Sequence, residues 1–213
     1  MPSFQKLVIL FTRYPVAGKC KTRLIPVLGA EGAVRIHRQL VSHILHELDT
    51  FISPRNTTEL TIYYDADSLQ QMQDWLGSSY IYNRQQGEDL GQRMADALIH
   101  GISNKKNSIL IGSDCPGINS AILNEGFEAL KQNDIVLGPA HDGGYYLIGV
   151  ARNIQPAACK QIFAQIPWGT DKVLSKTLAQ TQKLGLRHHR LSTLHDIDTL
   201  EDLKHFHHCS HPE

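Results

Sequence analysis

A loop that combines a glycine with several cations stands near the start of the chain. Lys19, Lys21 and Arg23 follow Gly18, and Arg13 precedes it. Backbone N–H groups and cationic side chains of such a loop can converge on one phosphate. A solvated basic turn is the competing interpretation of a charge cluster. Because an apolar run leads into the loop, the order of strand, glycine and cations favours a phosphate site.

This loop does not match a P-loop, although it contains a Gly-Lys pair and a nearby threonine. The G-x-x-x-x-G-K-[ST] pattern requires glycine at position 13, where this chain has Arg13. Thr22 also stands three residues after Lys19, whereas a P-loop hydroxyl directly follows its lysine. The loop is therefore predicted to hold phosphate in another way.

Carboxylates follow apolar runs or turns at several other places. Asp114 comes just after the apolar run 108–112, and Asp142 precedes a Gly-Gly pair. Asp196 and Asp198 are two residues apart, so in an extended segment both could face one cation. Mg²⁺ and Mn²⁺ take carboxylate and phosphate oxygens together. The competing interpretations are plain turns at Asp114 and Asp142 and, preferred from spacing alone, helix capping by Asp198 with Asp196 in solvent.

Two other clusters have weaker claims to a function. Trp168 begins a Trp-Gly-Thr loop in which it could pack on a substrate and Thr170 could cap a helix, although a tryptophan more often belongs to the core. Four histidines stand close to the end of the chain, and we assign them no role, because a terminal tract is commonly a frayed tail. These are His205, His207, His208 and His211.

These residues are carried by alternating strands and helices, which predict a parallel sheet with helices on both faces. The predicted strands are 7–11, 59–64, 80–82, 108–112, 134–139, 143–150 and 186–191. The predicted helices are 29–51, a short one ending at Leu76 and capped by Asp67 or Ser68, 90–102, 120–131, 155–164, 171–183 and 199–207.

The strand 143–150 follows its predecessor so closely that a parallel crossover has no room. It is therefore expected to run antiparallel, which makes the sheet mixed. Ligands of open α/β sheets gather at the carboxyl ends of strands where the strand order reverses. The basic loop, Asp114 and Asp142 all fall at such ends, so we expect them to share a site.

Composition excludes some classes of partner. With 213 residues, 41% of them hydrophobic and 20% charged, the chain has the makeup of one soluble α/β domain. Its 21 basic and 21 acidic residues leave no excess for a nucleic acid. No apolar run is long enough to span a membrane, and the start lacks an export signal. The cysteines are scattered without a CxxC pair, which is typical of a cytoplasmic protein: Cys20, Cys115, Cys159 and Cys209.

Six segments, in order from residue 11 to residue 203, carry a family resemblance. They read FTRYPVAGKCKTRL, QQGEDLGQRM, GSDCPG, LGPAHDGGYYLIG, IPWGTDKVL and LHDIDTLEDL. Together they resemble the DUF2064 family of GT-A-like nucleotide-diphospho-sugar transferases, a group that includes arsenosugar-biosynthesis glycosyltransferases. They are more distantly similar to 2-phospholactate guanylyltransferases and molybdenum-cofactor nucleotidyltransferases. Tyr14, Ala17 and Leu200 depart from the family pattern, and none of these changes removes a charge.

The resemblance implies a single domain, 1–213, with a Rossmann-like three-layer αβα sandwich around a mixed, mostly parallel sheet of about seven strands. It implies roles for many residues. The donor phosphates would be held by Arg13, Gly18, Lys19, Lys21 and Arg23. The base and ribose would be lined by Gln85, Gly87, Leu90, Gly91 and Arg93. A Mg²⁺ or Mn²⁺ ion would be bound by Asp114 and Asp198. The sugar or acceptor would be bordered by Asp142, Gly143, Gly144, Trp168 and Thr170.

The function that follows is a metal-dependent transferase with a nucleotide-activated donor and a small-molecule acceptor. Glycosyl transfer from a nucleotide sugar is favoured, and nucleotidyl transfer from a nucleoside triphosphate is the alternative. Lys19, Arg23 and Asp114 would act on the leaving group, and Asp142 is the candidate base. A nucleotide-binding module without turnover is the alternative of another class. The strand with Tyr145 suggests a homodimer interface, and the tail from about residue 208 to 213 is expected to be flexible.

Overall fold

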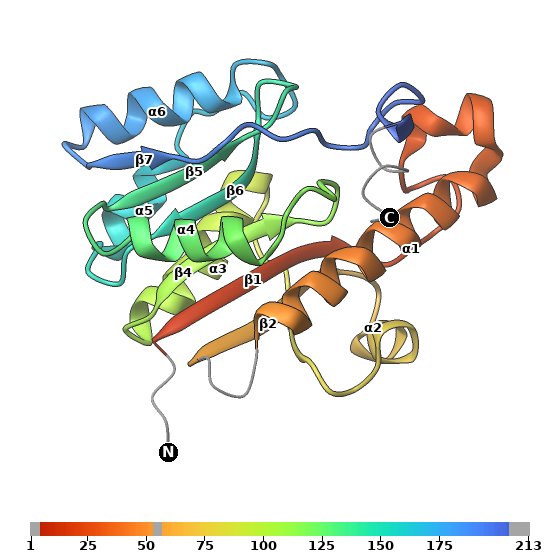
Figure 1. Cartoon of the computed structure of the whole chain (residues 1–213), viewed down its shortest axis with the longest axis horizontal. Coiled ribbons are helices and arrows are strands. Elements are labelled where there is room, and N and C mark those ends of the chain that lie inside the picture. Colours follow the sequence, from red (N-terminus) through yellow and green to blue (C-terminus); the bar gives the residue numbers. More distant parts are fainter. Residues whose placement is uncertain (1–4, 53–56, 205–213) are drawn as a thin grey trace.

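A seven-stranded mixed sheet forms the centre of the protein in a computed structural model that describes residues 5–52 and 57–204 (Figure 1). The predicted flexible tail and the four terminal histidines lie outside these described residues. The strand order is β3-β2-β1-β4-β6-β5-β7. The strands are β1 (Lys6–Arg13), β2 (Thr58–Asp65), β3 (Ile81–Arg84), β4 (Asn107–Gly112), β5 (Ile135–Pro139), β6 (Tyr145–Val150) and β7 (His188–Arg190).

The prediction of a mixed, mostly parallel sheet is confirmed. β6 pairs antiparallel with both β4 and β5, and the other described pairings are parallel. The short connection between β5 and β6 causes this reversal, because a parallel crossover needs a dozen or more residues. Gly143 within that connection has φ 88°, a left-handed conformation that glycine adopts easily.

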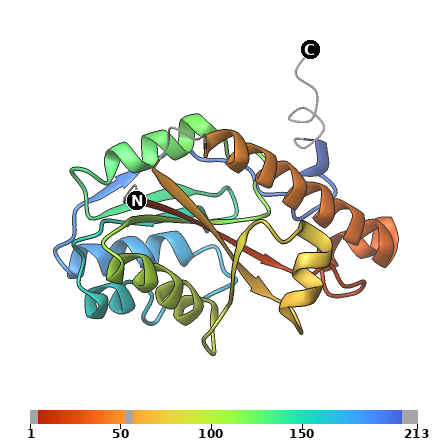
Figure 2. The ribbon, with the colours of Figure 1, turned by 90° about the horizontal axis from the view of Figure 1, so that it is seen from below.

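Helices cover both faces of the sheet, as Figure 2 shows from below. Successive residues of β1 alternate between two cores, because side chains of a strand point to opposite faces. Val8 packs in the core on one face of the sheet, whereas Leu7 packs in the core on the other face. One layer holds α1 (Ile25–Phe51), α2 (Leu69–Leu76) and α4 (Ser120–Ala129). The other holds α3 (Leu90–Ser103), α5 (Pro156–Ile162) and α6 (Val173–Lys183).

The amino end of α1 differs from the prediction. A short 3-10 helix, η1 (Thr22–Leu24), leads into α1, which begins at Ile25 rather than near Gly29. Gly29 interrupts the helix with φ 69° and ψ 169°. Arg23, the last cation of the basic loop, therefore lies within this turn of 3-10 helix. Of the two caps predicted for the short helix α2, Ser68 is the N-cap, and its side chain and Gln71 form a capping box.

The segment after β7 corrects the preferred interpretation of Asp198 as a helix cap. Residue 199 forms a bend and 200–202 form a turn, and only 203 and 204 of the predicted closing helix are helical within the described residues. The carboxylate of Asp202 accepts hydrogen bonds from the backbone N–H groups of Asp198 and Thr199, at 3.1 and 2.7 Å. Because Asp202 accepts these local hydrogen bonds, the carboxylate of Asp198 can face the basic loop.

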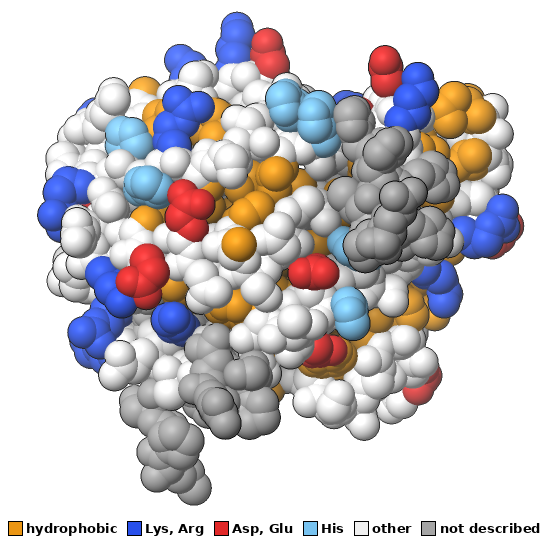
Figure 3. Space-filling model, viewed as in Figure 1, with side chains coloured by type: hydrophobic (Ala, Val, Ile, Leu, Met, Phe, Trp, Pro, Cys, Tyr) orange, Lys and Arg blue, Asp and Glu red, His pale blue; other side chains and the backbone are white. Residues whose placement is uncertain are grey.

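Charged side chains of both signs are spread over the face that carries α1 and α4 (Figure 3), in keeping with the balanced composition. No helix within residues 5–52 and 57–204 is long and apolar enough to cross a membrane. β6 lies inside the sheet, and its Tyr146 is 5% exposed, so this strand offers no free edge to a second copy. The homodimer therefore stays a prediction, and β6, the strand that suggested it, does not offer the interface.

Candidate active site

The strand order reverses at β1, which places a crevice at the carboxyl ends of β1 and β4. β1 pairs in parallel with β2 on one side and with β4 on the other. The basic loop leaves the end of β1, and Asp114 follows the end of β4. The chain from residue 191 to 204, here called the closing segment, returns to the same place from β7 (Figure 1).

Backbone hydrogen bonds fix the closing segment across these strand ends. The N–H of Leu194 donates to the carbonyl of Pro139, at 3.0 Å, and the N–H of His141 donates to Leu194 at 3.1 Å. Further along, the N–H of Ile197 donates to the carbonyl of Asp114 at 2.8 Å. The closing segment thus spans from β5 to the loop after β4, and it delivers Asp196 and Asp198 to the crevice.

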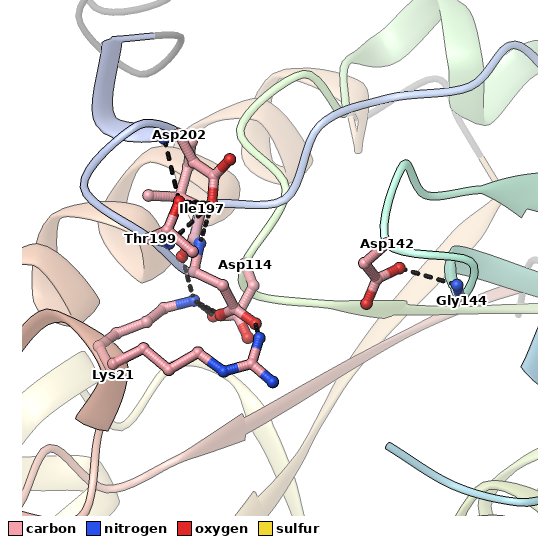
Figure 4. Close-up of polar contacts among 9 residues, drawn as sticks. Lys21, Asp114, Asp142, Gly144, Ile197, Thr199 and Asp202 are labelled. Carbon is pink, nitrogen blue, oxygen red and sulfur yellow. Dashed lines mark hydrogen bonds and ion pairs between the residues drawn. The ribbon is translucent and has the colours of Figure 1, made fainter. Parts of the chain in front are cut away.

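The ammonium of Lys21 is the centre of the site (Figure 4). Its Nζ lies 2.8 Å from Oδ1 of Asp114 and 3.0 Å from Oδ1 of Asp198, and it donates to the carbonyl of Ile197 at 2.6 Å. The side chain of Lys21 is 4% exposed, whereas those of Asp114 and Asp198 are 49% and 35% exposed. Residues from three separate segments therefore meet at one buried cation.

The charge of Lys21 is stabilised despite its burial. Burial by itself lowers the pKa of the ammonium, but Asp114 and Asp198 raise it, and the net pKa lies above the ordinary value of 10.5. Lys21 is consequently protonated throughout the physiological pH range. Its backbone has φ 47° and ψ 46°, a left-handed conformation that is uncommon for a residue with a Cβ.

The other cations of the loop are held less firmly. Nη1 of Arg23 lies 3.4 Å from Oδ2 of Asp198, and the Arg23 side chain is 68% exposed. Arg13 donates from Nη1 to the carbonyl of Lys19 at 3.3 Å, which braces the loop from its start. No ion pair of Lys19 occurs in the described part of the chain. Lys19 and Arg23 are thus the cations best placed to take up phosphate.

A cleft of about 390 Å³, here called the basic cleft, opens over these groups. It joins the basic loop to the ends of β1, β2 and β4. Of the residues predicted for the donor and the metal, those that line it are Arg13, Lys19, Lys21, Arg23, Gln85, Leu90, Asp114 and Asp198. The sequence patterns therefore identified most of the charged wall of this cleft.

The side chain of Gln85 presents a hydrogen-bond acceptor at the edge of the basic cleft. Its Nε2 donates to the backbone carbonyls of Thr12, at 3.2 Å, and of Tyr63, at 3.0 Å. Because both partners are carbonyls, the amide nitrogen is used toward the sheet and the amide oxygen remains for a ligand. Thr12 also lines the cleft, and its buried Oγ1 has no hydrogen-bond partner among the described residues.

Four residues predicted for the nucleotide lie outside the lining of the basic cleft. Gly18 forms the turn of the loop, with φ 82°. Arg93 donates from Nε to the carbonyl of Gly87 at 3.2 Å and lies 3.7 Å from Asp65. Gly87 and Gly91 line a separate hollow of about 580 Å³ between α3 and α5. These four residues therefore set the course of the chain around the basic cleft, and they do not line the cleft itself.

A second cavity of about 510 Å³ adjoins the basic cleft, and it is here called the acceptor cavity after the role predicted for its residues. The two share Arg23, Asp114 and Asp198 in their walls. Of the residues predicted for the sugar or acceptor, those that line the second cavity are Asp142, Gly144, Trp168 and Thr170. Gly143 stands behind this wall, where its carbonyl accepts a hydrogen bond from the N–H of Leu174 at 2.9 Å.

Trp168 is held by close packing against α3. A Cβ added to Gly91 would lie 2.6 Å from the Trp168 ring, so glycine is what lets the ring approach the helix. The ring also lies 6.4 Å from that of Phe163, measured between centroids. Trp168 therefore belongs partly to the core, as its residue type suggests, and still forms a wall of the acceptor cavity.

One carboxylate oxygen of Asp142 forms a hydrogen bond within its own turn. Its Oδ1 accepts a hydrogen bond from the N–H of Gly144 at 2.7 Å, as Figure 4 shows some way from Lys21. Asp196 lines the same cavity, and burial, followed by the nearby charge of Asp142, raises its pKa to about 6. From spacing alone Asp196 was expected in solvent, whereas the structure places it, partly buried, in the wall of this cavity.

Sequence patterns also missed His37 and Asp65, which line the basic cleft. His37 lies on α1, is 4% exposed, and donates from Nε2 to the carbonyl of Arg13 at 3.0 Å. Burial lowers its pKa below 6.5, so the ring is neutral at pH 7. Asp65 is the last residue of β2, and Asp114 similarly follows the end of β4. An acidic residue at the end of an apolar strand is therefore the sequence signal that could have identified Asp65.

Comparison with known proteins places this site in a family. The model of DUF2064, described as an uncharacterized protein conserved in bacteria, matches residues 52–170. A crystal structure from Desulfovibrio desulfuricans G20, of a proposed nucleotide-diphospho-sugar transferase, is 32% identical over 95% of this chain and 86% of that one, with a TM-score of 0.85. The chain belongs to the DUF2064 family.

More distant structures share the fold of this DUF2064 protein. A Methanothermobacter nucleotidyl transferase has a TM-score of 0.61 at 14% identity, over 96% of this chain and 97% of that one. Rv0371c of Mycobacterium tuberculosis H37Rv, solved in complex with manganese, has a TM-score of 0.52 at 13% identity, over 94% and 97%. No curated protein matches the chain. The predicted Rossmann-like fold of nucleotide-dependent transferases is thereby confirmed.

Proposed function

We propose that this DUF2064 protein is a metal-dependent transferase that moves a glycosyl group from a nucleotide sugar to a small-molecule acceptor. The observation that carries the proposal is the meeting of two cavities at Arg23, Asp114 and Asp198. A donor whose phosphates lie in the basic cleft would present its transferred group to the acceptor cavity at this border. The structural relatives support the transferase class.

Lys19 and Arg23 would hold the donor phosphates. Both line the basic cleft, and Arg23 stands at its border with the acceptor cavity. Charge-assisted hydrogen bonds to phosphate are stronger than neutral ones. They strengthen further as negative charge develops on a departing nucleoside diphosphate, which favours the transition state over the bound donor.

The donor set around Lys21 fits a Mg²⁺ or Mn²⁺ ion that shares its ligands with phosphate. Asp114 is half exposed, and no described residue is hydrogen-bonded to its Oδ2. Asp198 contributes a second carboxylate. No group of three His, Cys, Asp or Glu side chains within 5–52 and 57–204 could hold a metal unaided. Phosphates and water would complete the shell, and the ion would neutralise charge on the leaving group.

The acceptor cavity supplies carboxylates for the acceptor's proton. In glycosyl transfer the acceptor oxygen bonds to the anomeric carbon while the bond from that carbon to the phosphate oxygen breaks. The hydroxyl proton passes to a carboxylate, and Asp142 is the proposed base, through the oxygen that does not bond Gly144. Trp168 would form the apolar wall against which the acceptor or sugar packs.

Nucleotidyl transfer is the second candidate, favoured by the shared fold with a nucleotidyl transferase. In that reaction an acceptor phosphate attacks the α-phosphorus of a nucleoside triphosphate, and pyrophosphate leaves. Incubation with nucleotide sugars or nucleoside triphosphates, with Mn²⁺ or with EDTA, separates the two reactions by product. We expect release of nucleoside diphosphate from a nucleotide sugar. Pyrophosphate would establish the second candidate, and binding of neither donor class would contradict both.

A further inference from the structure

Acceptors of the protein itself engage the ammonium of Lys21. A lysine ammonium carries three hydrogens. Three acceptors lie within 3.0 Å of Nζ, namely Oδ1 of Asp114, Oδ1 of Asp198 and the carbonyl oxygen of Ile197. Lys21 therefore differs from the exposed Lys19 of the same loop, and its role is distinct from the phosphate contact that the sequence suggests.

We propose that Lys21 is a positioning residue that occupies the cation position between Asp114 and Asp198 in the nucleotide-free protein. A divalent metal ion then binds these carboxylates tightly only together with the phosphates of the donor. This inference rests on the proposed use of a metal by the enzyme. It adds an order to the reaction, in which the metal enters with the nucleotide and not before it.

Electrostatics gives the reason for this order. Two carboxylates would present two negative charges to a metal ion, but the ammonium that both contact cancels one of them. A metal ion on Oδ2 of Asp114 would also lie close to this ammonium. Because the Lys21 side chain is 4% exposed, water screens the repulsion poorly. Donor phosphates reverse the balance, since they add negative charge and oxygen ligands together.

The surrounding chain keeps Lys21 in this position. Its left-handed backbone, with φ 47°, leads directly into η1, where the N–H of Leu24 donates to the carbonyl of Lys21 at 2.9 Å. On the other side, the hydrogen bond from Ile197 to the carbonyl of Asp114 fixes the two carboxylate-bearing segments together. The ammonium is thus built into the fold, whereas Arg23, at 68% exposure, can move toward a ligand.

Titration with Mn²⁺, followed by the electron paramagnetic resonance signal of the free ion, tests the inference without any turnover. The wild type is compared with Lys21→Met, Lys21→Gln and Lys21→Arg, each in the absence of nucleotide. Lys19→Met is the matched control, because it removes a cation of the same loop that contacts neither carboxylate. Lys21→Gln retains hydrogen-bonding capacity and decides the result if Lys21→Met does not fold.

We expect removal of the charge at position 21 to tighten Mn²⁺ binding by about tenfold or more, since a like charge is removed beside the ion. Lys21→Arg and Lys19→Met should resemble the wild type. Unchanged or weaker Mn²⁺ binding in both neutral variants would overturn the inference. The wild type is also titrated with a nucleoside diphosphate present. If Mn²⁺ then fails to bind, the proposed metal dependence itself is wrong, which is a separate outcome.

Discussion

Nζ of Lys21, in the loop after β1, lies 2.8 Å from Oδ1 of Asp114, which follows β4. The contact joins the two strands between which the sheet reverses its order, so it marks the crevice where open α/β sheets bind ligands. The closing segment adds Asp198 to the same ammonium at 3.0 Å. The basic loop and the acidic residues thus form one site.

Asp114→Asn tests the role of the carboxylate with little change of shape. We expect metal-dependent turnover to be lost and the free energy of unfolding to fall by about 1 kcal/mol, because Lys21 keeps Asp198 and Ile197 as partners. Turnover assays and urea unfolding measure the two effects. A variant that binds nucleotide and retains full turnover would contradict the assignment. A wild type that binds nucleotide but turns nothing over would instead indicate a binding module.

Lys19→Met and Arg23→Met test the phosphate contacts. Each should weaken binding of a nucleoside diphosphate by about 10- to 100-fold, the worth of a hydrogen bond to a charged group. Calorimetric titration measures this loss, which should shrink at high salt because the cations are exposed. Lys131→Met serves as a control, because it removes a lysine that is 61% exposed, follows the carboxyl end of α4 and lines neither cavity. Equal affinities in all variants would place the phosphates elsewhere.

Gly91→Ala tests the packing that sets Trp168 in the acceptor cavity. The new methyl group would lie 2.6 Å from the ring, closer than contact allows, so the ring must shift. We expect the KM for the acceptor to rise while the affinity for the nucleotide stays within about twofold. Intrinsic tryptophan fluorescence reports the shift of the ring. A change in nucleotide affinity with no change at the acceptor would contradict the division into two cavities.

The buried ring of His37 predicts a dependence of stability on pH. Burial lowers its pKa in the folded protein below 6.5, so its contribution to stability is present above 6.5 and is lost as the pH falls through the folded-state pKa. The free energy of unfolding of the wild type should therefore approach that of His37→Gln between about pH 7.5 and about pH 5.5. Urea unfolding at a series of pH values measures both. A gap that widens on acidification would contradict the lowered pKa.

The order of elements was predictable because apolar periodicity and short connections fix it locally. The tight turn at Asp142 required an antiparallel β6, and the structure has it. The capping role of Asp198 was predicted wrongly for the opposite reason. Spacing along the chain does not reveal that Asp202 takes the local N–H groups, nor that Lys21 draws Asp198 into the crevice.

The candidate site was predictable where charge and glycine stand together in the sequence. Lys19, Arg23 and Asp114 are of this kind, and all three line the basic cleft. His37 was not predictable, because the sequence around a histidine on the buried face of a helix does not show which residues it will contact. The burial of Lys21 was hidden as well, because its three partners come from residues far away in the sequence.

A crystal structure of the protein with a nucleoside diphosphate and Mn²⁺ tests the central claim most directly. We predict phosphates in contact with Lys19 and Arg23, Mn²⁺ on Asp114 and Asp198, and the open end of the diphosphate directed to the acceptor cavity. Gln85 should accept a hydrogen bond from the nucleoside through its amide oxygen. A nucleotide bound away from the basic cleft, or phosphates that contact neither Lys19 nor Arg23, would contradict the account.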